Sequence, residues 1–198
     1  MKKLFVLLVC MLMNIALHTE SMACTRVVYQ GPDSTIITAR SMDWKDEIPA
    51  GMWIFPRGMQ RNGEVGPNSI TWKSRYGSVV ISSFDNSTTD GMNERGLVAN
   101  LLWLAESEYP RYDRKQQGLT IAAWAQYVLD NFASVKEAVD ELRKEKFMIF
   151  SDFIPGTDTL TTLHLSISDA TGDNAIFEFI GGKLVINHDR TYNVMTNS

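Results

Sequence analysis

Cys24 stands where a cysteine could serve as an N-terminal nucleophile. The chain of 198 residues opens with Lys2-Lys3, runs through an apolar stretch from Leu4 to Leu17, and reaches Ser21-Met22-Ala23 directly before this cysteine. A charged start, a short apolar segment and small residues at the last and third-last positions predict a signal peptide over 1–23. Cleavage after it would give Cys24 a free α-amino group.

Removal of that segment would also leave Cys24 as the only thiol, because the other cysteine, Cys10, lies inside it. A single cysteine in an exported chain has no internal disulfide partner, which indicates a chemical role. A thiol has a reference pKa of about 8.5 and an α-amine one of about 7.7–8.0, so the amine can take the proton of the thiol. Attack on an acyl carbon would give a thioester that water opens, while hydrogen-bond donors stabilise the oxyanion.

Three other interpretations of Cys24 remain open at this point. It could be lipidated as the first residue of a lipoprotein, although Ser21 stands where lipidation usually has an aliphatic residue. It could be a buried residue, with the cleavage site elsewhere. It could pair with His164 or His188 in an enzyme of the papain type, although Cys24-Thr25-Arg26 lacks the aromatic and glycine context of those enzymes.

The composition predicts one globular domain and excludes several classes of partner. The predicted mature segment, 24–198, is long enough for one domain with a hydrophobic core. A net charge of −4 without a basic cluster argues against nucleic acid and anionic membranes as partners. No later segment is long enough to span a membrane, and the three histidines are too scattered to predict a metal site. We expect an exported protein, periplasmic or secreted, without a metal site; a homo-oligomer remains possible.

Strands, then a helical pair, then strands again predict an α+β domain. Two β-rich runs, 25–30 and 35–39, flank Gly31-Pro32-Asp33-Ser34, which predicts a hairpin. Further strands are expected at 77–83, 96–104, 161–168, 174–180, 183–187 and 191–196, with a turn at 90–96 and helices at 119–132 and 134–144. The apolar segment 48–62 is interpreted as a loop at the entrance of the site or as a strand on the core. The chain stops inside a strand-like run, so we expect a C-terminally truncated sequence.

Four motifs resemble those of the choloylglycine hydrolase (bile salt hydrolase) and penicillin V acylase family of N-terminal nucleophile hydrolases. They occur in the order and at the spacing of that family, and they are Cys24-Thr25-Arg26, Ala39–Trp44, Asp90–Leu97 and Val194–Ser198. The resemblance implies a four-layer αββα sandwich, of which this chain would be an incomplete part. It also implies a small-molecule amide substrate and hydrolysis of linear non-peptide amide C–N bonds without a cofactor.

The resemblance implies roles for four residues. Cys24 would be the nucleophile and its α-amine the base. Arg40 and Asp43 would lie beside that amine and thiol, where a carboxylate can orient an ammonium group and a guanidinium can favour a thiolate. Asn197 would contribute to the oxyanion site, since an amide N–H is a neutral donor suited to it.

Two features depart from the pattern of the family. A later active-site arginine would lie beyond Ser198, and Trp103 stands where many Gram-positive members carry an asparagine that helps to bind the oxyanion; this resembles the Gram-negative branch. Trp44 and Trp103 could wall an apolar cleft for the acyl group, or they could be core residues. Bile salts are the leading substrate, with penicillin V or an acyl-homoserine lactone as alternatives. The alternative to an enzyme is a non-catalytic protein of the same fold that is lipid-anchored or binds a ligand.

Overall fold

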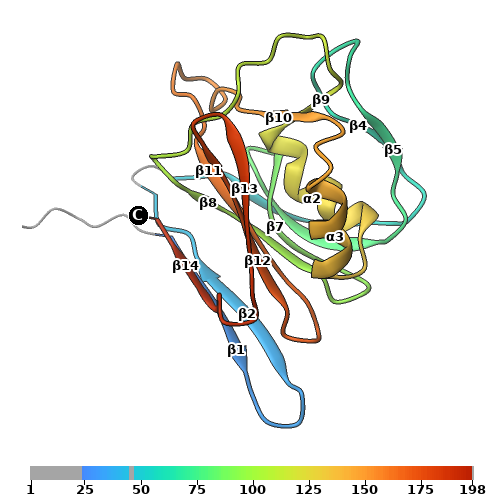
Figure 1. The fold of residues 1–198 in the computed structure, drawn as a ribbon, viewed down its shortest axis with the longest axis vertical. Helices are drawn as coiled ribbons and strands as arrows, with labels where there is room; N and C mark the ends of the chain where they lie inside the picture. The colour runs from blue at the N-terminus through green and yellow to red at the C-terminus, as the bar shows by residue number, and fades with distance from the viewer. Residues whose placement is uncertain (1–23, 45–46, 198) are drawn as a thin grey trace, which may run out of the picture.

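The computed structural model describes residues 24–44 and 47–197. The predicted signal peptide at 1–23 lies outside the described residues. The largest element is a seven-stranded sheet in which consecutive neighbours pair antiparallel (Figure 1). Its strands, in spatial order, are β13 (Lys183–His188), β12 (Asn174–Ile180), β11 (Leu163–Ser168), β8 (Val98–Trp103), β7 (Ser87–Asn93), β6 (Ser78–Ser83) and β3 (Ala50–Phe55).

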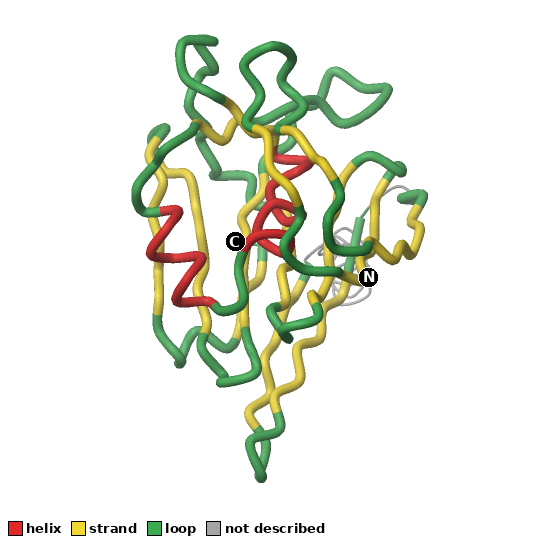
Figure 2. The backbone as a smooth tube through the Cα atoms, turned by 90° about the vertical axis from the view of Figure 1, so that its right-hand side faces the viewer, coloured by secondary structure: helices red, strands yellow, loops and turns green. Residues whose placement is uncertain are grey.

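A second sheet has three strands and carries both ends of the described chain. Its order is β14 (Val194–Thr196), β1 (Thr25–Gln30) and β2 (Ile36–Ser41), all antiparallel. The predicted hairpin is thus confirmed, and its tip extends beyond the seven-stranded sheet in both views (Figures 1 and 2). Because β14 pairs with β1, the last described residues lie beside Cys24.

Two short two-stranded sheets complete the strand inventory of the described chain. They pair β4 (Gln60–Asn62) with β5 (Thr71–Lys73), and β9 (Gly118–Thr120) with β10 (Met148–Phe150). The first pair is antiparallel and the second parallel.

Two helices cover one face of the seven-stranded sheet. They are α2 (Ile121–Asn131) and α3 (Val135–Leu142), close to the predicted ranges. Ser134 caps α3 as expected, because its hydroxyl accepts a hydrogen bond from the Glu137 N–H and the Glu137 carboxylate accepts one from the Ala133 N–H. The main core lies under these helices, with Trp124 and Phe177 fully buried in edge-to-face contact.

The three-stranded sheet packs on the opposite face of the seven-stranded sheet. Thr38 on β2 hydrogen-bonds Ser168 on β11 at 2.7 Å, and a small apolar cluster joins Cys24 to Leu102 and Ile176. The α+β class and the arrangement of two facing sheets agree with the expectation. The described residues supply one helical layer and two sheets; the outer face of the three-stranded sheet exposes Val27, Tyr29 and Ile37.

One local prediction needs revision. The predicted turn 90–96 is wrong in its first half, because Asp90 to Asn93 belong to β7 and the chain turns only at Glu94–Leu97. Of the two interpretations of segment 48–62, the structure agrees with the strand: it contains the edge strand β3, from which Phe55 packs against the core, and only Ile48 of the segment lines the cleft described below.

Candidate active site

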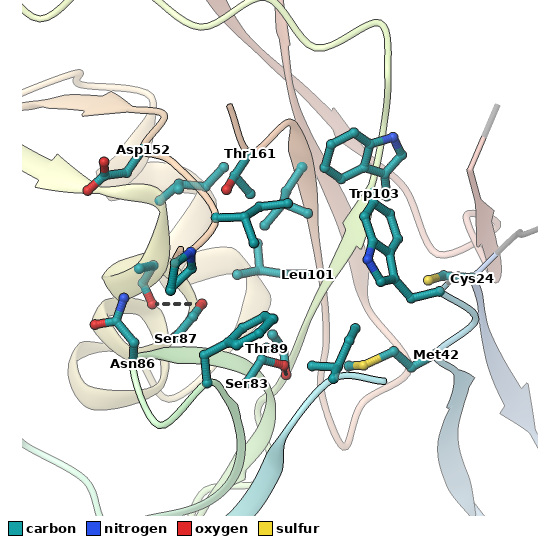
Figure 3. A pocket seen from close by; sticks show the side chains of 18 of the residues that line it. Cys24, Met42, Ser83, Asn86, Ser87, Thr89, Leu101, Trp103, Asp152 and Thr161 are labelled. Carbon is teal, nitrogen blue, oxygen red and sulfur yellow. Dashed lines mark hydrogen bonds between the residues drawn. The ribbon is translucent and has the colours of Figure 1, made fainter. Parts of the chain in front are cut away.

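A cleft of about 880 Å³, counted to its open mouth, has Cys24 at one end. Its walls come from both sheets, the start of α2 and the segment 152–161 between β10 and β11. Figure 3 shows Cys24, Met42 and Trp103 on one side of the cleft, and Asn86, Ser87 and Asp152 on the other. The thiol therefore lies at the end of a cleft that is open to solvent.

Cys24 is 4% exposed and precedes the first residue of β1. Its Sγ lies 3.7 Å from the carbonyl oxygen of Asp43, and its own carbonyl accepts a hydrogen bond from the Asn197 N–H at 3.3 Å. A residue at a strand end, fixed on both sides by backbone contacts, has a defined position relative to the cleft. This is the geometry that a nucleophile needs.

Asn197 holds the backbone nitrogen of Cys24. Its side-chain amide is satisfied when the nitrogen donates to the Trp103 carbonyl at 2.8 Å and the oxygen accepts from the Cys24 nitrogen at 3.3 Å. The structure thus brings Asn197 to the nucleophile as the sequence predicts. In this arrangement its amide oxygen orients the nitrogen of Cys24, and one of its two N–H bonds is used by the Trp103 carbonyl.

Arg40 lines the cleft and carries a carboxylate partner. Its Nη1 lies 2.5 Å from Asp90 Oδ2, and its Nη2 donates to the Leu101 carbonyl at 3.2 Å. The other oxygen of Asp90 accepts a hydrogen bond from the side-chain amide of Asn100 at 2.8 Å. The side chains of Arg40 and Asp90 are 10% and 12% exposed, so this ion pair is largely removed from water.

Asp43 reaches the thiol through its main chain. Its carboxylate is exposed and accepts a hydrogen bond from the Ser41 hydroxyl at 2.8 Å, whereas its carbonyl faces the Cys24 sulfur. Among the described residues no hydrogen bond joins this carboxylate to the Cys24 nitrogen, which in the uncleaved chain is part of a peptide bond.

The two predicted binding tryptophans form one aromatic wall. The rings of Trp44 and Trp103 lie with their centroids 4.9 Å apart at an interplanar angle of 53°, and both line the cleft. Leu101, Ile121 and Phe153 extend the apolar lining. Both tryptophans are half-buried and line the cleft, a position that favours the predicted wall over a place in the core.

Arg26 is a residue near the site that the sequence reasoning did not single out. It is fully buried, and it donates to the Asn174 side chain at 2.6 Å and to the carbonyls of Tyr192 and Ile167. Burial lowers its pKa to about 10. Strand alternation was the available signal, because a buried Cys24 places residue 26 on the same inward face of β1.

His164 is buried on β11, where burial lowers its pKa and the nearby carboxylate of Glu178 partly offsets this effect. It does not line the cleft, so a papain-type pairing with Cys24 has no geometric support. Among the described residues, no group of histidines, cysteines and carboxylates is placed to hold a metal ion. No helix in the same part of the chain is long and apolar enough to cross a membrane.

Two facing sheets, with helices on the far side of one and a buried cysteine heading the first strand, define an N-terminal nucleophile hydrolase fold. Comparison with known proteins agrees. Residues 24–198 match the model of the family described as linear amide C–N hydrolases, choloylglycine hydrolase family. The chain belongs to this family.

Two curated relatives come from different activity classes. The chain is 54% identical to penicillin V acylase of Pectobacterium atrosepticum, over 96% of this chain and 54% of that protein. It is 29% identical to bile salt hydrolase/transferase of Clostridium perfringens, over 88% of this chain and 53% of that protein. The chain thus spans about half the length of these relatives.

Solved structures give the same result. Penicillin V acylase from Agrobacterium tumefaciens matches with a TM-score of 0.81 and 60% identity, over 88% of this chain and 52% of that one. A mutant of the conjugated bile acid hydrolase from Clostridium perfringens matches with a TM-score of 0.73 and 26% identity, over 88% and 53%. Members of both activity classes therefore share the fold.

Proposed function

We propose that this protein hydrolyses the amide bond of small N-acyl compounds with an apolar or aromatic acyl group, with Cys24 as an N-terminal nucleophile. The observation that carries the proposal is the position of Cys24, at the start of β1 and at the end of a cleft walled by Trp44 and Trp103. The proposal includes export, periplasmic or secreted, with removal of 1–23, because only cleavage after Ala23 gives Cys24 an α-amine.

The proposed mechanism begins with transfer of the thiol proton to that α-amine. The sulfur attacks the acyl carbon, the amine product leaves with the proton, and water opens the thioester. Asn197 supports this sequence because its side-chain oxygen holds the nitrogen of Cys24. That contact favours a role in positioning the base, in addition to or in place of the predicted role at the oxyanion.

As substrate we propose penicillin V in preference to conjugated bile salts. Two facts support this order: the 54% identity to a penicillin V acylase against 29% to a bile salt hydrolase/transferase, and the paired indole rings, which suit a planar aromatic group. The sequence alone favoured bile salts. An acyl-homoserine lactone stays an alternative, because an aliphatic chain could also fill this lining.

The test starts with the intact mass and the N-terminal sequence of the exported protein. A mass that begins at unmodified Cys24, together with release of phenoxyacetate from penicillin V, is the expected result. Glycocholate and an acyl-homoserine lactone are assayed in parallel. Cys24→Ser should lose nearly all turnover, and Cys24→Ala should lose it fully.

Other outcomes identify the alternatives. A lipid-sized mass addition on Cys24 would block the amine and favour an anchored, non-catalytic protein. A free Cys24 without turnover of any of the three amides would also contradict the proposal. Hydrolysis that persists in Cys24→Ala would exclude the mechanism while keeping the activity.

A further inference from the structure

We infer that Asp90 is a positioning residue that fixes Arg40 beside Cys24 and cancels its charge, so that the cleft accepts uncharged acyl groups. The part of the inference that concerns acyl groups rests on the proposed function. The central test of the role of Asp90 does not require turnover. The inference gives a role to the motif Asp90–Leu97, whose first residue the proposed mechanism does not use.

Strand register explains why a counter-charge is needed here. Arg26 and Arg40 are direct cross-strand partners on β1 and β2, and both side chains are directed away from solvent. Two like charges directly opposite each other on a sheet destabilise it. Arg26 has no carboxylate within 4.0 Å among the residues that the structure describes, since its partners are Asn174 and two carbonyls.

Asp90 supplies a carboxylate to Arg40, and this ion pair lowers the net charge of the two facing arginines. Asp90 lies on β7, in the other sheet, opposite Asn100 on β8. Its two oxygens are both used, one by Arg40 and one by the Asn100 amide, so the carboxylate cannot rotate without losing a contact. The carboxamide oxygen of Asn100 is buried and has no hydrogen-bond partner. The side chain therefore interacts through its N–H group, which donates to Asp90.

The register also places Arg40 next to the nucleophile. Thr25 pairs with Ser41, so Arg40 is a diagonal neighbour of the residue before Thr25, which is Cys24. Diagonal neighbours lie about 7–8 Å apart between their Cα atoms, a distance at which a bare charge in a partly buried site acts strongly. With Asp90 attached, the guanidinium keeps its N–H groups in place but presents little net charge to the thiol.

The chemistry of the lining agrees with this assignment. Apart from Arg40, the one charged side chain among the described residues of the cleft wall is Asp152, on the side opposite Cys24 (Figure 3). An anionic acyl group would thus meet no free cation there.

The test compares two thiol reagents of similar size, neutral iodoacetamide and anionic iodoacetate. Their rates at Cys24 are measured in the full chain by mass spectrometry of the Cys24 peptide, which separates it from Cys10. Asp90→Asn keeps the shape of the side chain and removes its charge. The iodoacetate-to-iodoacetamide rate ratio should rise about tenfold at low ionic strength and fall back when salt is added.

Matched variants separate positioning from general loss of stability. Asn100→Leu should raise the ratio less, because Asp90 keeps its charge but loses one support. Asp130→Asn removes another buried carboxylate, which accepts from Trp72 and Gln126 on the helical side of the sheet, and should leave the ratio unchanged. An unchanged ratio in a folded Asp90→Asn protein, confirmed by circular dichroism, would overturn the inference.

Turnover provides a second readout in the processed protein. Asp90→Asn should lower kcat for a neutral acyl amide more than it raises KM, and it should improve the relative rate on an acyl group that carries a carboxylate. If the wild-type chain hydrolyses no amide, the reagent ratio still decides the role of Asp90, so failure of the proposed function and failure of this inference remain distinguishable.

Discussion

Asn197 and Cys24 are hydrogen-bonded twice, once between main chains and once through the Asn197 side chain. The Asn197 N–H donates to the Cys24 carbonyl, and the side-chain oxygen accepts from the Cys24 nitrogen, both at 3.3 Å. The pairing of β14 with β1 produces this contact between the two ends of the described chain. A residue that holds the nitrogen of the nucleophile affects the rate more than the fold.

Asn197→Ala should therefore lower kcat for penicillin V by about 10²-fold, the range seen when a polar group that acts in the transition state is removed. The unfolding free energy should fall by only about 1 kcal/mol, because the main-chain contact remains. Steady-state kinetics and urea denaturation measure the two effects. A variant that keeps full kcat would show that this side chain is dispensable for the reaction.

Trp103→Ala should weaken selection of aromatic acyl groups. The loss of an aromatic contact worth about 0.5–1.5 kcal/mol predicts a rise in KM for phenoxyacetyl amides of about three- to tenfold, with a smaller change for short aliphatic amides. Trp53→Ala is the matched control, because Trp53 is 48% exposed on β3 and does not line the cleft. Equal effects of both variants would contradict the assigned wall.

The burial of His164 leads to a prediction of how the stability of the fold depends on pH. Burial lowers its pKa below the ordinary value of 6.5, so the unfolded chain binds a proton at a higher pH than the folded chain. The unfolding free energy should then decrease as pH falls below about 6.5, by at most about 1.4 kcal/mol per pH unit from this group. Urea denaturation at pH 7.5, 6.5 and 5.5 measures the slope. His164→Gln should reduce it, and a slope that is unchanged in the variant would assign the effect to other groups.

Gly91 is a second position of the motif at 90–97 for which the structure gives a reason. A Cβ there would lie 2.8 Å from Leu129 Cδ1 and 2.8 Å from Val80 Cγ1, so α2 packs against bare backbone. Gly91→Ala should destabilise the fold by about 1–3 kcal/mol. Adding Leu129→Ala should cost less than the two single changes together, because the clash is partly relieved. Additive losses in thermal unfolding would show that the contact does not limit packing.

Local sequence patterns predicted most of the secondary structure. The hairpin around Gly31–Ser34 and the capping box at Ser134 depend on short-range interactions that a few residues encode. The motif at 90–97 was misread because it contains glycine and asparagine, which usually indicate turns. Here Gly91 is required by the approach of Leu129, a tertiary contact that no local pattern contains.

The sequence predicted which residues form the site better than it predicted the contacts between them. Cys24, Arg40 and Asn197 come together as the motifs indicated, and Trp44 meets Trp103. The partners of Arg40 were not predictable, because Asp90 and Asn100 reach it from the opposite sheet and depend on how the two sheets face each other. The contacts of Arg26 could not be predicted for the same reason, because its partners lie on β11, on β12 and before β14.

The contact between Asn197 and the Cys24 nitrogen also bears on the order of maturation. In the full chain that nitrogen is still a peptide N–H with a single hydrogen, and the Asn197 oxygen already accepts it. After cleavage of the preceding bond the same oxygen would accept one hydrogen of the new amine, whose lone pair would be available to take the proton of the thiol. One contact would thus serve the nitrogen of Cys24 both as an amide and as a base.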